Sequence, residues 1–424
     1  MKYKQYQKYK DSGVEWIGEI PEHWESRKLK FTTKFENSTI DRHVYDDEIP
    51  VSICHYPQVY NNETISLKTE LPKGTCNQKE FENFRLKKDD VLITKDSETP
   101  DDIGVPVYIL DDFKNSVCGY HIAQLSTDKN QLLGGFLFRF IQSSYVNAYF
   151  ETEANGITRY GLGKDSISNL IIPLPPKPEQ QQIYDFLQKE TKQFSNLISK
   201  SQSQINLLQE KRQALINHAV TKGLDPTVPM KDSGVEWIGE VPEHWEVKRL
   251  KFVCQLNYGD SLQKENRVGG DIDVYGSNGI VGTHNIAITN SSTIIIGRKG
   301  SIGEINFSAN SCYPIDTTYY IDNLTTSENL RWIYYLLQTL ELNRLNQDSA
   351  VPGLSRETVY QIKLPIPKKE EQTQISEFLD KETTQFDELI SKSQSQVNLL
   401  QEKRQALITS TVTGKIDVRN GVAA

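Results

Sequence analysis

The sequence predicts two mixed α/β (α+β) domains separated by two long helices that form an antiparallel coiled coil, with the whole chain built as an internal pseudo-two-fold repeat. Three observations lead to this fold class. Two blocks of sequence each occur twice, the segments between the blocks differ from each other, and each half ends in a long stretch of helix-forming residues.

The repeated blocks form two nearly identical frames. Residues 10–31 match residues 231–252 at 18 of 22 positions, and residues 197–216 match residues 389–408 at 19 of 20 positions. A tandem duplication without functional pairing would also leave two copies. However, the frames are nearly identical and the inserts differ, so we interpret the frames as performing one task twice and the inserts as performing two different tasks. The expected divisions are a first domain at 1–170, a first helix at 171–222, a second domain at 223–362, and a second helix with a C-terminal tail at 363–424.

The inserts, residues 32–170 and 253–362, share little except GLGKD at 161–165 and GLSRE at 353–357. Short apolar runs bounded by Gly, Asp or Asn predict strands in both. The expected strands are residues 90–94, 105–110, 292–297 and 317–321, and helix-like runs follow at 132–150 and 327–346.

Each long helix carries an apolar seam with a period of about 3.5 residues, which is typical of a coiled coil. The obvious partner for one seam is the other copy, although each helix could instead pack on its own insert. Exposed positions that match between the copies suggest one docking surface presented twice. The residues assigned to the coiled coil and partner docking are Ile183, Leu187, Ile198, Ile205, Leu208, Leu215, Ile375, Leu379, Ile390, Val397, Leu400 and Leu407, and Phe194 and Phe386 complete the seam.

The remaining frame block is rich in tryptophan and turn residues. Trp16 and Trp24 recur as Trp237 and Trp245. We expect these indoles to pack against the bases of the long helices, which is a structural role.

Composition argues against simple charge-driven binding to nucleic acid. The chain carries 48 Lys and Arg against 56 Asp and Glu, a net charge of −8, and the two inserts have net charges of −7 (14 against 21) and −4 (7 against 11). Five cysteines without CxxC spacing predict reduced thiols and no zinc site. No apolar run approaches the length of a membrane span, so we expect a cytoplasmic protein without membrane contact.

Catalytic and cofactor motifs are missing from the sequence. It contains no GxxxxGK[ST], HExxH or GxSxG pattern, and its seven histidines lack metal-ligand spacing. Asp96, Asp101 and Asp102 resemble a nuclease carboxylate cluster only loosely, because the corresponding loop of the other half, residues 298–301, has no carboxylate. We therefore expect no catalytic residue, no metal and no bound cofactor.

The inserts do offer loops with exposed polar and basic groups, which suit phosphate contacts and base-edge hydrogen bonds. Each loop alone could equally be a solvated turn. The candidate DNA-binding residues are Lys95, Arg159, Tyr160, Lys164, Tyr275, Ser277, Asn278, Arg298, Lys299 and Arg356.

Together, two W-I-G-E-[IV]-P-x-H-W blocks, two variable inserts and two helices with L-L-Q-E-K-R-Q-A-L-I resemble the DNA specificity subunit of type I restriction-modification systems. The resemblance covers nearly the whole chain. It implies that the inserts are target recognition domains, each reading one half of an asymmetric bipartite site in double-stranded DNA, and that the helices set the spacing.

The resemblance also implies the partners. The subunit would be non-catalytic and would dock two methyltransferase subunits, which bind S-adenosylmethionine and methylate adenine. Restriction subunits that use ATP would join through the complex. The alternative is a coiled-coil scaffold that joins two interaction domains without reading DNA.

Overall fold

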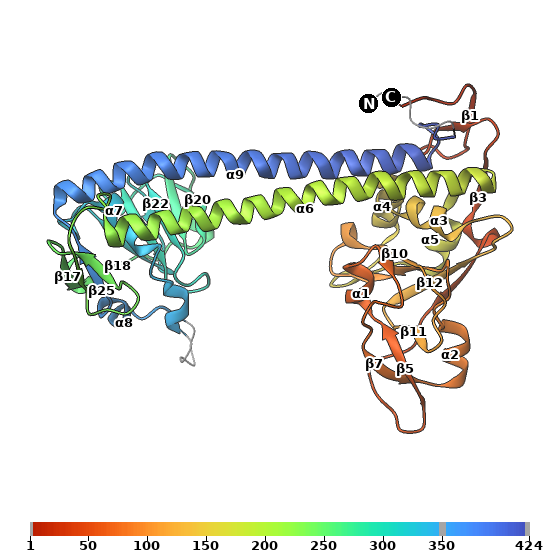
Figure 1. Cartoon of the computed structure of the whole chain (residues 1–424), viewed down its shortest axis with the longest axis horizontal. Helices are drawn as coiled ribbons and strands as arrows, with labels where there is room; N and C mark the ends of the chain where they lie inside the picture. The colour runs from red at the N-terminus through yellow and green to blue at the C-terminus, as the bar shows by residue number, and fades with distance from the viewer. Residues whose placement is uncertain (1–2, 347–352, 420–424) are drawn as a thin grey trace. The chain divides into compact units, whose positions relative to one another are not determined.

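The computed structural model describes residues 3–346 and 353–419, and the chain divides into two compact units (Figure 1). Unit 1 comprises Met1–Ser201 together with Ser395–Ala424, and unit 2 comprises Gln202–Gln394. The expected linear division differs in two respects. The C-terminal tail belongs with the first domain, and residues 171–174 form a strand of that domain ahead of the first long helix.

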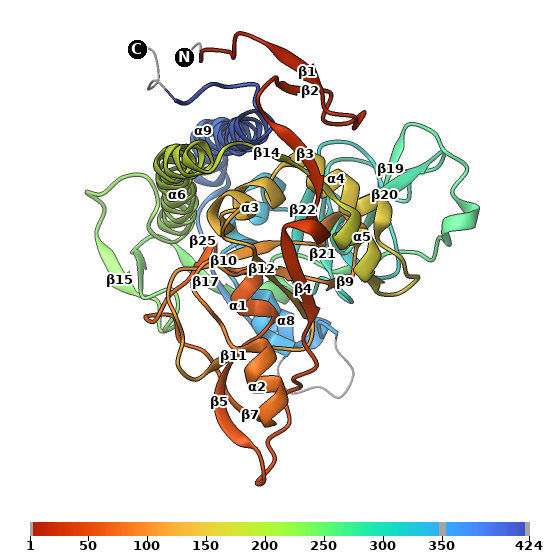
Figure 2. The ribbon, with the colours of Figure 1, turned by 90° about the vertical axis from the view of Figure 1, so that its right-hand side faces the viewer.

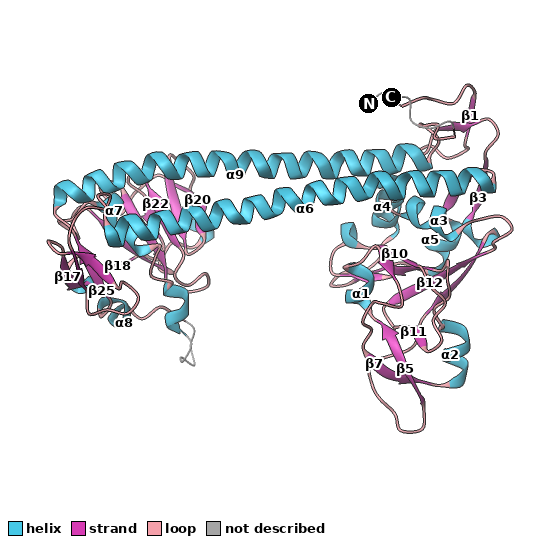
Figure 3. Ribbon diagram, in the orientation of Figure 1, coloured by secondary structure: helices cyan, strands magenta, loops and turns pink. Residues whose placement is uncertain are grey.

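Unit 1 contains two sheets joined by a shared core. The larger has the strand order β4-β12-β8-β10-β6, and the smaller has the order β11-β5-β7. Figure 3 shows the smaller sheet beside helix α2. The strands are β1 (Tyr9–Asp11), β2 (Glu19–Pro21), β3 (Glu25–Lys28), β4 (Thr33–Asn37), β5 (Ile49–Cys54), β6 (Thr64–Ile65), β7 (Lys73–Cys76), β8 (Val91–Thr94), β9 (Asp96–Ser97), β10 (Pro106–Ile109), β11 (Ser116–Cys118), β12 (Ile122–Thr127), β13 (Tyr160–Gly161) and β14 (Ile171–Leu174). The shorter helices are η1 (Leu29–Phe31), α1 (Tyr56–Tyr60), α2 (Gln78–Phe84), η2 (Pro100–Asp102), α3 (Gly134–Ile141), α4 (Ser144–Glu153) and α5 (Lys164–Asn169).

Unit 2 repeats this plan with fewer strands. Its larger sheet has the order β18-β24-β21-β22, and its smaller sheet has the order β20-β19-β23. The strands are β15 (Met230–Asp232), β16 (Glu240–Pro242), β17 (Glu246–Arg249), β18 (Asn257–Tyr258), β19 (Ile272–Gly276), β20 (Gly279–His284), β21 (Thr293–Gly297), β22 (Ile305–Ser308), β23 (Tyr313–Pro314), β24 (Thr318–Asp322) and β25 (Lys363–Ile366). The shorter helices are η3 (Leu250–Phe252), η4 (Lys264–Asn266), α7 (Leu330–Leu337), η5 (Leu342–Asn346) and α8 (Arg356–Tyr360).

The two inserts share one topology although their sequences differ. In the larger sheet of unit 1, β4 pairs with β12, and β12 pairs on its other side with β8. In the larger sheet of unit 2, β18 pairs with β24, and β24 pairs on its other side with β21. In each smaller sheet the central strand, β5 or β19, has one antiparallel neighbour and one parallel neighbour. The inserts are therefore two versions of one domain.

The four strands expected from apolar runs are confirmed as β8, β10, β21 and β24, within one or two residues at each end. The two helix-like runs are each interrupted. Residues 132–150 form α3 and α4, because Ser143 accepts a hydrogen bond from the Val146 N–H and so begins a new helix. Residues 327–346 form α7 and then the 3-10 helix η5.

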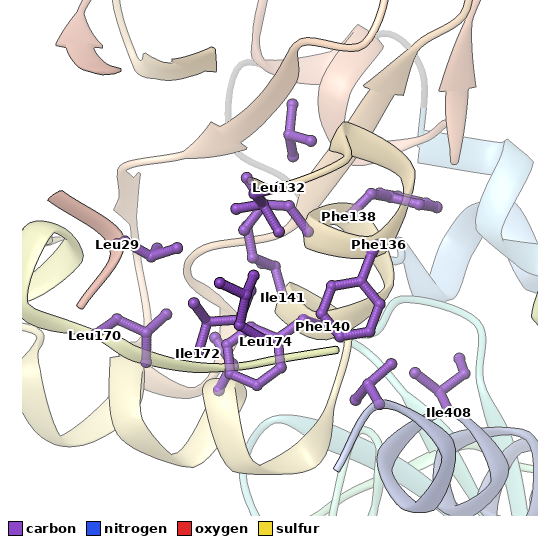
Figure 4. Packing of buried hydrophobic residues seen from close by; sticks show 14 of the residues in the cluster. Leu29, Leu132, Phe136, Phe138, Phe140, Ile141, Leu170, Ile172, Leu174 and Ile408 are labelled. Carbon is purple, nitrogen blue, oxygen red and sulfur yellow. The ribbon is translucent and has the colours of Figure 1, made fainter. Parts of the chain in front are cut away.

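The core of unit 1 forms where helix α3 meets the larger sheet and the long helices. Phe136, Phe140 and Ile141 of α3 are fully buried beside Leu170 and Ile172, and Ile408 of the second long helix reaches the same cluster (Figure 4). The cluster also contains Ile183 and Leu187 of the first long helix. Apolar burial of about 1.5–3 kcal/mol per large side chain makes this the main stabilising contact of the unit.

The long helices are α6 (Lys177–Lys222) and α9 (Lys369–Val412), and they pair in antiparallel fashion within each unit. In unit 1 the beginning of α6 packs with the end of α9, and Figure 2 shows α3 beside this pair. In unit 2 Ile216 and Val220 near the end of α6 pack with Ile375 and Leu379 near the beginning of α9. The apolar seam therefore contacts both the other long helix and the core of the domain. Pairing of the helices and packing of a helix on its insert, the two expected arrangements, are both present.

The tryptophan block packs against the end of a long helix in both units. Trp24 and Trp245 are fully buried, as predicted. Trp24 lies against Gly414 and Trp245 against Gly223, two glycines with φ near +75° that end α9 and α6, a conformation that L side chains rarely adopt. Trp16 instead stacks on Tyr149 of α4, and the prediction was also wrong for Trp237, whose surface is 41% exposed.

Candidate nucleic-acid interface

Unit 1 contains a cleft of about 900 Å³ beside the ends of β8 and β12. Five segments that are distant in sequence line it, at residues 40–43, 55–60, 96–102, 120–121 and 158–159. The strand order places them together, because β8 leads directly into Asp96 and β12 begins directly after His121.

An aspartate and a histidine form the polar centre of this cleft. His121 Nδ1 lies 2.7 Å from Asp96 Oδ2, and the Lys95 N–H donates to the His121 carbonyl oxygen at 3.1 Å. Arg159 Nη2 is 3.2 Å from the same Nδ1 atom. An ionised carboxylate can only accept, so we assign the Nδ1 proton to the bond with Asp96. The Arg159 guanidinium then lies beside the pair as a positive neighbour without a hydrogen bond to this nitrogen.

Two stacked tyrosines form a second wall. Tyr56 and Tyr60 lie one turn apart on α1, with ring centroids 5.6 Å apart and an interplanar angle of 15°. The Tyr60 hydroxyl donates to Asp102, 2.9 Å from Oδ2. This hydrogen bond raises the pKa of Tyr60 above its usual value, and burial raises that of Tyr56. Both phenols therefore stay protonated at neutral pH, and the Tyr60 proton is used in the bond to Asp102.

Of the four residues expected to contact DNA in the first insert, Arg159 lines the cleft, and Lys95 and Tyr160 contact residues of its walls. The Lys95 ammonium lies 4.7 Å from the centre of the Tyr120 ring, and the exposed Arg159 lies beside His121. Tyr160 is half-buried, in the short strand that pairs with Ser97. Lys164 is exposed as the first residue of α5 and does not line the cleft.

In unit 2 two arginines meet over one tyrosine. The guanidinium carbons of Arg298 and Arg356 lie 5.3 Å and 5.0 Å from the centre of the Tyr258 ring. Arg298 Nη2 donates to the Asp316 carbonyl oxygen at 2.8 Å. These residues line a cleft of about 330 Å³ together with Lys299 and Tyr319.

This arginine pair is electrostatically incomplete. Two like charges share one aromatic ring, and the carboxylate of Glu357 lies only 3.9 Å from Arg356 Nε as a weak counter-charge. Within the described part of the chain, Nε of Arg298 and Nε of Arg356 are buried without a hydrogen-bond acceptor. Guanidinium groups arranged in this way suit phosphate oxygens or the acceptor edge of guanine.

The other candidates of the second insert occupy different environments. The side chain of Lys299 is exposed and lines the cleft, and Ser277 lies against the Arg298 loop, since a Cβ on Gly300 would be 3.3 Å from its Oγ. Asn278 is exposed beside Ser277. Tyr275 is buried against Ile295 and Cys312, so we assign it to the support of the sheet.

The two clefts occur at the same place in the shared topology. The Leu162 N–H donates to the Lys95 carbonyl oxygen and the Leu354 N–H to the Arg298 carbonyl oxygen, each at 2.8 Å. The matching GLGKD and GLSRE segments thus dock on equivalent turns, which makes Lys95 equivalent to Arg298 and Asp96 equivalent to Lys299. Sequence reasoning missed the aromatic residues around these turns. Tyr258 and Tyr319 form a cross-strand pair, and only the strand register reveals it.

The seam residues of the long helices face packed surfaces. Ile183, Leu187, Ile205, Ile375, Leu379, Val397 and Leu407 are buried, and Ile198, Leu208, Leu215, Ile390 and Leu400 are half-buried. They therefore stabilise the helix pairing. Four leucines outside the seam, Leu197, Leu207, Leu389 and Leu399, are 48–49% exposed and form two equivalent pairs in the repeat.

Arg212 and Arg404 occupy equivalent positions but have different partners. Arg212 pairs with Asp387 in unit 2 at 2.9 Å, and Arg404 contacts Glu63 in unit 1. The fact that both equivalent positions hold arginine therefore does not by itself indicate a docking surface.

Residues 3–346 and 353–419 contain no group of three or more His, Cys, Asp or Glu side chains that could hold a metal ion. Within the same ranges, none of the helices combines the length and apolarity required to cross a membrane. The five cysteines are buried and unpaired.

Comparison with known proteins gives a consistent result. The family model described as the type I restriction modification DNA specificity domain matches residues 21–207 and again residues 242–399. A putative type I restriction enzyme MjaX specificity subunit from Methanocaldococcus jannaschii is 22% identical, over 86% of this chain and 87% of its own. The EcoprrI specificity subunit of Escherichia coli is 25% identical over 32% of this chain and 35% of its own.

A solved structure shares the fold. A chain from a study of complex assembly and conformational transition of the type I R-M system aligns with a TM-score of 0.68 and 15% identity, covering 94% of this chain and 99% of that one.

Proposed function

The chain belongs to the type I restriction-modification DNA specificity family, with two copies of the family domain, and we propose that each copy reads one half of an asymmetric bipartite site in double-stranded DNA. One observation carries this proposal. Two domains that share a sheet topology, apart from the additional strand β6 in the first, present different side chains from the same turn, Lys95 and Asp96 in one and Arg298 and Lys299 in the other. Two domains with the same scaffold but different side chains at this turn suit the recognition of two different DNA sequences.

The long helices set the spacing of the two half-sites and dock two methyltransferase subunits. The repeated surface supports this assignment, because Leu197 and Leu389 are equivalent and equally exposed, as are Leu207 and Leu399. Exposed apolar side chains at matched positions are typical of a partner interface. Restriction subunits join through the assembled complex.

The chemistry resides on the partners. The methyltransferase subunits bind S-adenosylmethionine and methylate adenine, and the restriction subunits use ATP. This chain supplies sequence recognition without catalysis. Its acidic balance fits that division, because a domain with net charge −7 gains little affinity from phosphate attraction alone. DNA binding is therefore weak for the isolated chain and specific in the complex.

The test combines this chain with its cognate methyltransferase subunit, S-adenosylmethionine and genomic DNA, followed by sequencing of the methylated adenines. We expect one two-part motif. Assembly without site-specific methylation would contradict DNA reading and favour a scaffold, and methylation by this chain alone would contradict a non-catalytic subunit.

A further inference from the structure

We infer that the cleft of unit 1 reads a base pair through Asp96, whose carboxylate accepts a hydrogen bond from the exocyclic amino group of cytosine or adenine in the major groove. This inference rests on the proposed function and names the chemistry of the first half-site. The major groove presents exactly one amino donor per base pair, on C or on A, and aspartate is a suitable acceptor for it.

The first argument is the position of Asp96 in the shared topology. It follows Lys95 at the turn after β8, and the equivalent position after β21 holds Lys299. The two domains therefore place opposite charges at one backbone position. A carboxylate accepts hydrogen bonds and an ammonium donates them, so the two half-sites present opposite hydrogen-bonding groups there.

The second argument is that a hydrogen bond orients the Asp96 carboxylate, which can still accept another hydrogen bond. His121 Nδ1 donates a hydrogen bond to Asp96 Oδ2 at 2.7 Å. Oδ1 lies along the backbone of Gly161, where a Cβ would come within 3.3 Å of it. The side chain of Asp96 keeps 22% of its surface exposed toward the cleft. A carboxylate oriented by one donor retains lone pairs for a second donor from a ligand.

The third argument is electrostatic. Asp41, Glu98 and Asp102 line the same cleft, within an insert of net charge −7. Carboxylates that face DNA are repelled by phosphates, so an acidic cleft can contact DNA only where nearby cations or hydrogen-bond donors, such as the amino group of a base, offset the repulsion. Arg159 beside His121 offsets part of this repulsion.

The experiment uses the complete complex with its methyltransferase subunits and measures dissociation constants at one fixed salt concentration. The probes are duplexes carrying the methylation motif, in which one amino group at a time is deleted from the first half-site, with 2-pyrimidinone in place of cytosine or purine in place of adenine. The adenine that receives the methyl group is left unchanged.

We expect one such deletion to weaken binding by the wild-type complex about tenfold, the size of one good base contact. Asp96→Ala removes the side-chain acceptor, so it should weaken binding to the intact site by a similar factor and become insensitive to that same deletion, while recognition of the second half-site stays unchanged. Asp101→Ala is the matched control, because Asp101 is exposed, lies outside the cleft and loses the same charge.

Two results would overturn the inference: no amino deletion in the first half-site weakens wild-type binding, or Asp96→Ala remains as sensitive as wild type. The deletion series with wild-type protein decides the question even if the variant fails to fold. Absence of any two-part motif in the wild-type complex would instead reject the proposed function.

Discussion

The two recognition domains differ in what they present and agree in how they are built. The turn after β8 in unit 1 places Lys95 over Tyr120 and joins Asp96 to His121, whereas the turn after β21 in unit 2 places Arg298 over Tyr258 beside Arg356. The strand order is the same apart from the additional strand β6 in unit 1, and the backbone bonds from Leu162 and Leu354 are equivalent. The strand ladders thus fix the same backbone architecture in both domains, and the side chains at this turn differ.

This contrast predicts that equivalent substitutions in the frames act alike, whereas equivalent substitutions in the inserts act on different half-sites. The frames supply the largest expected effect. Ile183→Asp and Ile375→Asp each place an unpaired carboxylate at a fully buried position of a long helix. Each should destabilise its unit by about 3–5 kcal/mol or prevent folding. Thermal unfolding measures the effect, and Ile183→Val and Ile375→Val are controls expected to lose about 1 kcal/mol. A large loss for only one of the Asp variants would break the equivalence of the frames.

The next effect concerns the arginine pair. Arg298→Ala removes the donor fork above Tyr258, so recognition of the second half-site should weaken by about 10- to 100-fold, or 1–3 kcal/mol, and the first half-site should be unchanged. The methylated motif and the binding constants of the assembled complex report this. Arg344→Ala, which removes an exposed arginine paired with Glu341 in the same unit, should have no such effect. An equal loss at both half-sites would mean that Arg298 supports the fold.

A smaller effect tests the repeated surface of the helices. Leu197→Asp and Leu389→Asp change exposed side chains, so both variants should fold. Each should weaken the docking of one methyltransferase subunit by roughly tenfold, which is about 1.4 kcal/mol. Native mass spectrometry should then show complexes with one methyltransferase subunit in place of two. Full occupancy in both variants would remove these leucines from the interface.

The smallest effect distinguishes lysine from arginine at the equivalent turn. Lys95→Ala removes one point charge, so binding should fall by only a few-fold, about 1 kcal/mol or less, and the slope of log K against log salt should decrease by about 1. Only the first half-site should be involved. A loss as large as that of Arg298→Ala would show that Lys95 reads a base directly.

Much of the fold could be predicted because its signals are local. The seam from Ile183 to Leu215 predicted a long paired helix, and apolar runs such as residues 292–297 predicted central strands. The common topology of the inserts could not be predicted by comparing the amino-acid sequences of the two inserts. Strand ladders depend on the alternation and length of apolar segments, which different residues satisfy equally well.

The site was predicted in part for a related reason. Lys95, Arg298 and Arg356 stand out as basic residues in turns, and the structure places the last two on one ring. The cleft around Asp96 escaped because its walls come from five distant segments. The sequence singled out Arg159, Asp96 and Asp102 separately but gave no sign that they line one cleft, and the i, i+4 spacing of Tyr56 and Tyr60 is a further local signal for it.

The central claim is that each insert reads one half-site independently on equivalent frames. Replacing residues 253–362 by a second copy of residues 32–170 tests it most directly, with the methylated motif of the assembled complex as the measurement. The account predicts a motif made of the first half-site twice, with no trace of the second. Persistence of the second half-site, or a motif unrelated to either, would contradict it.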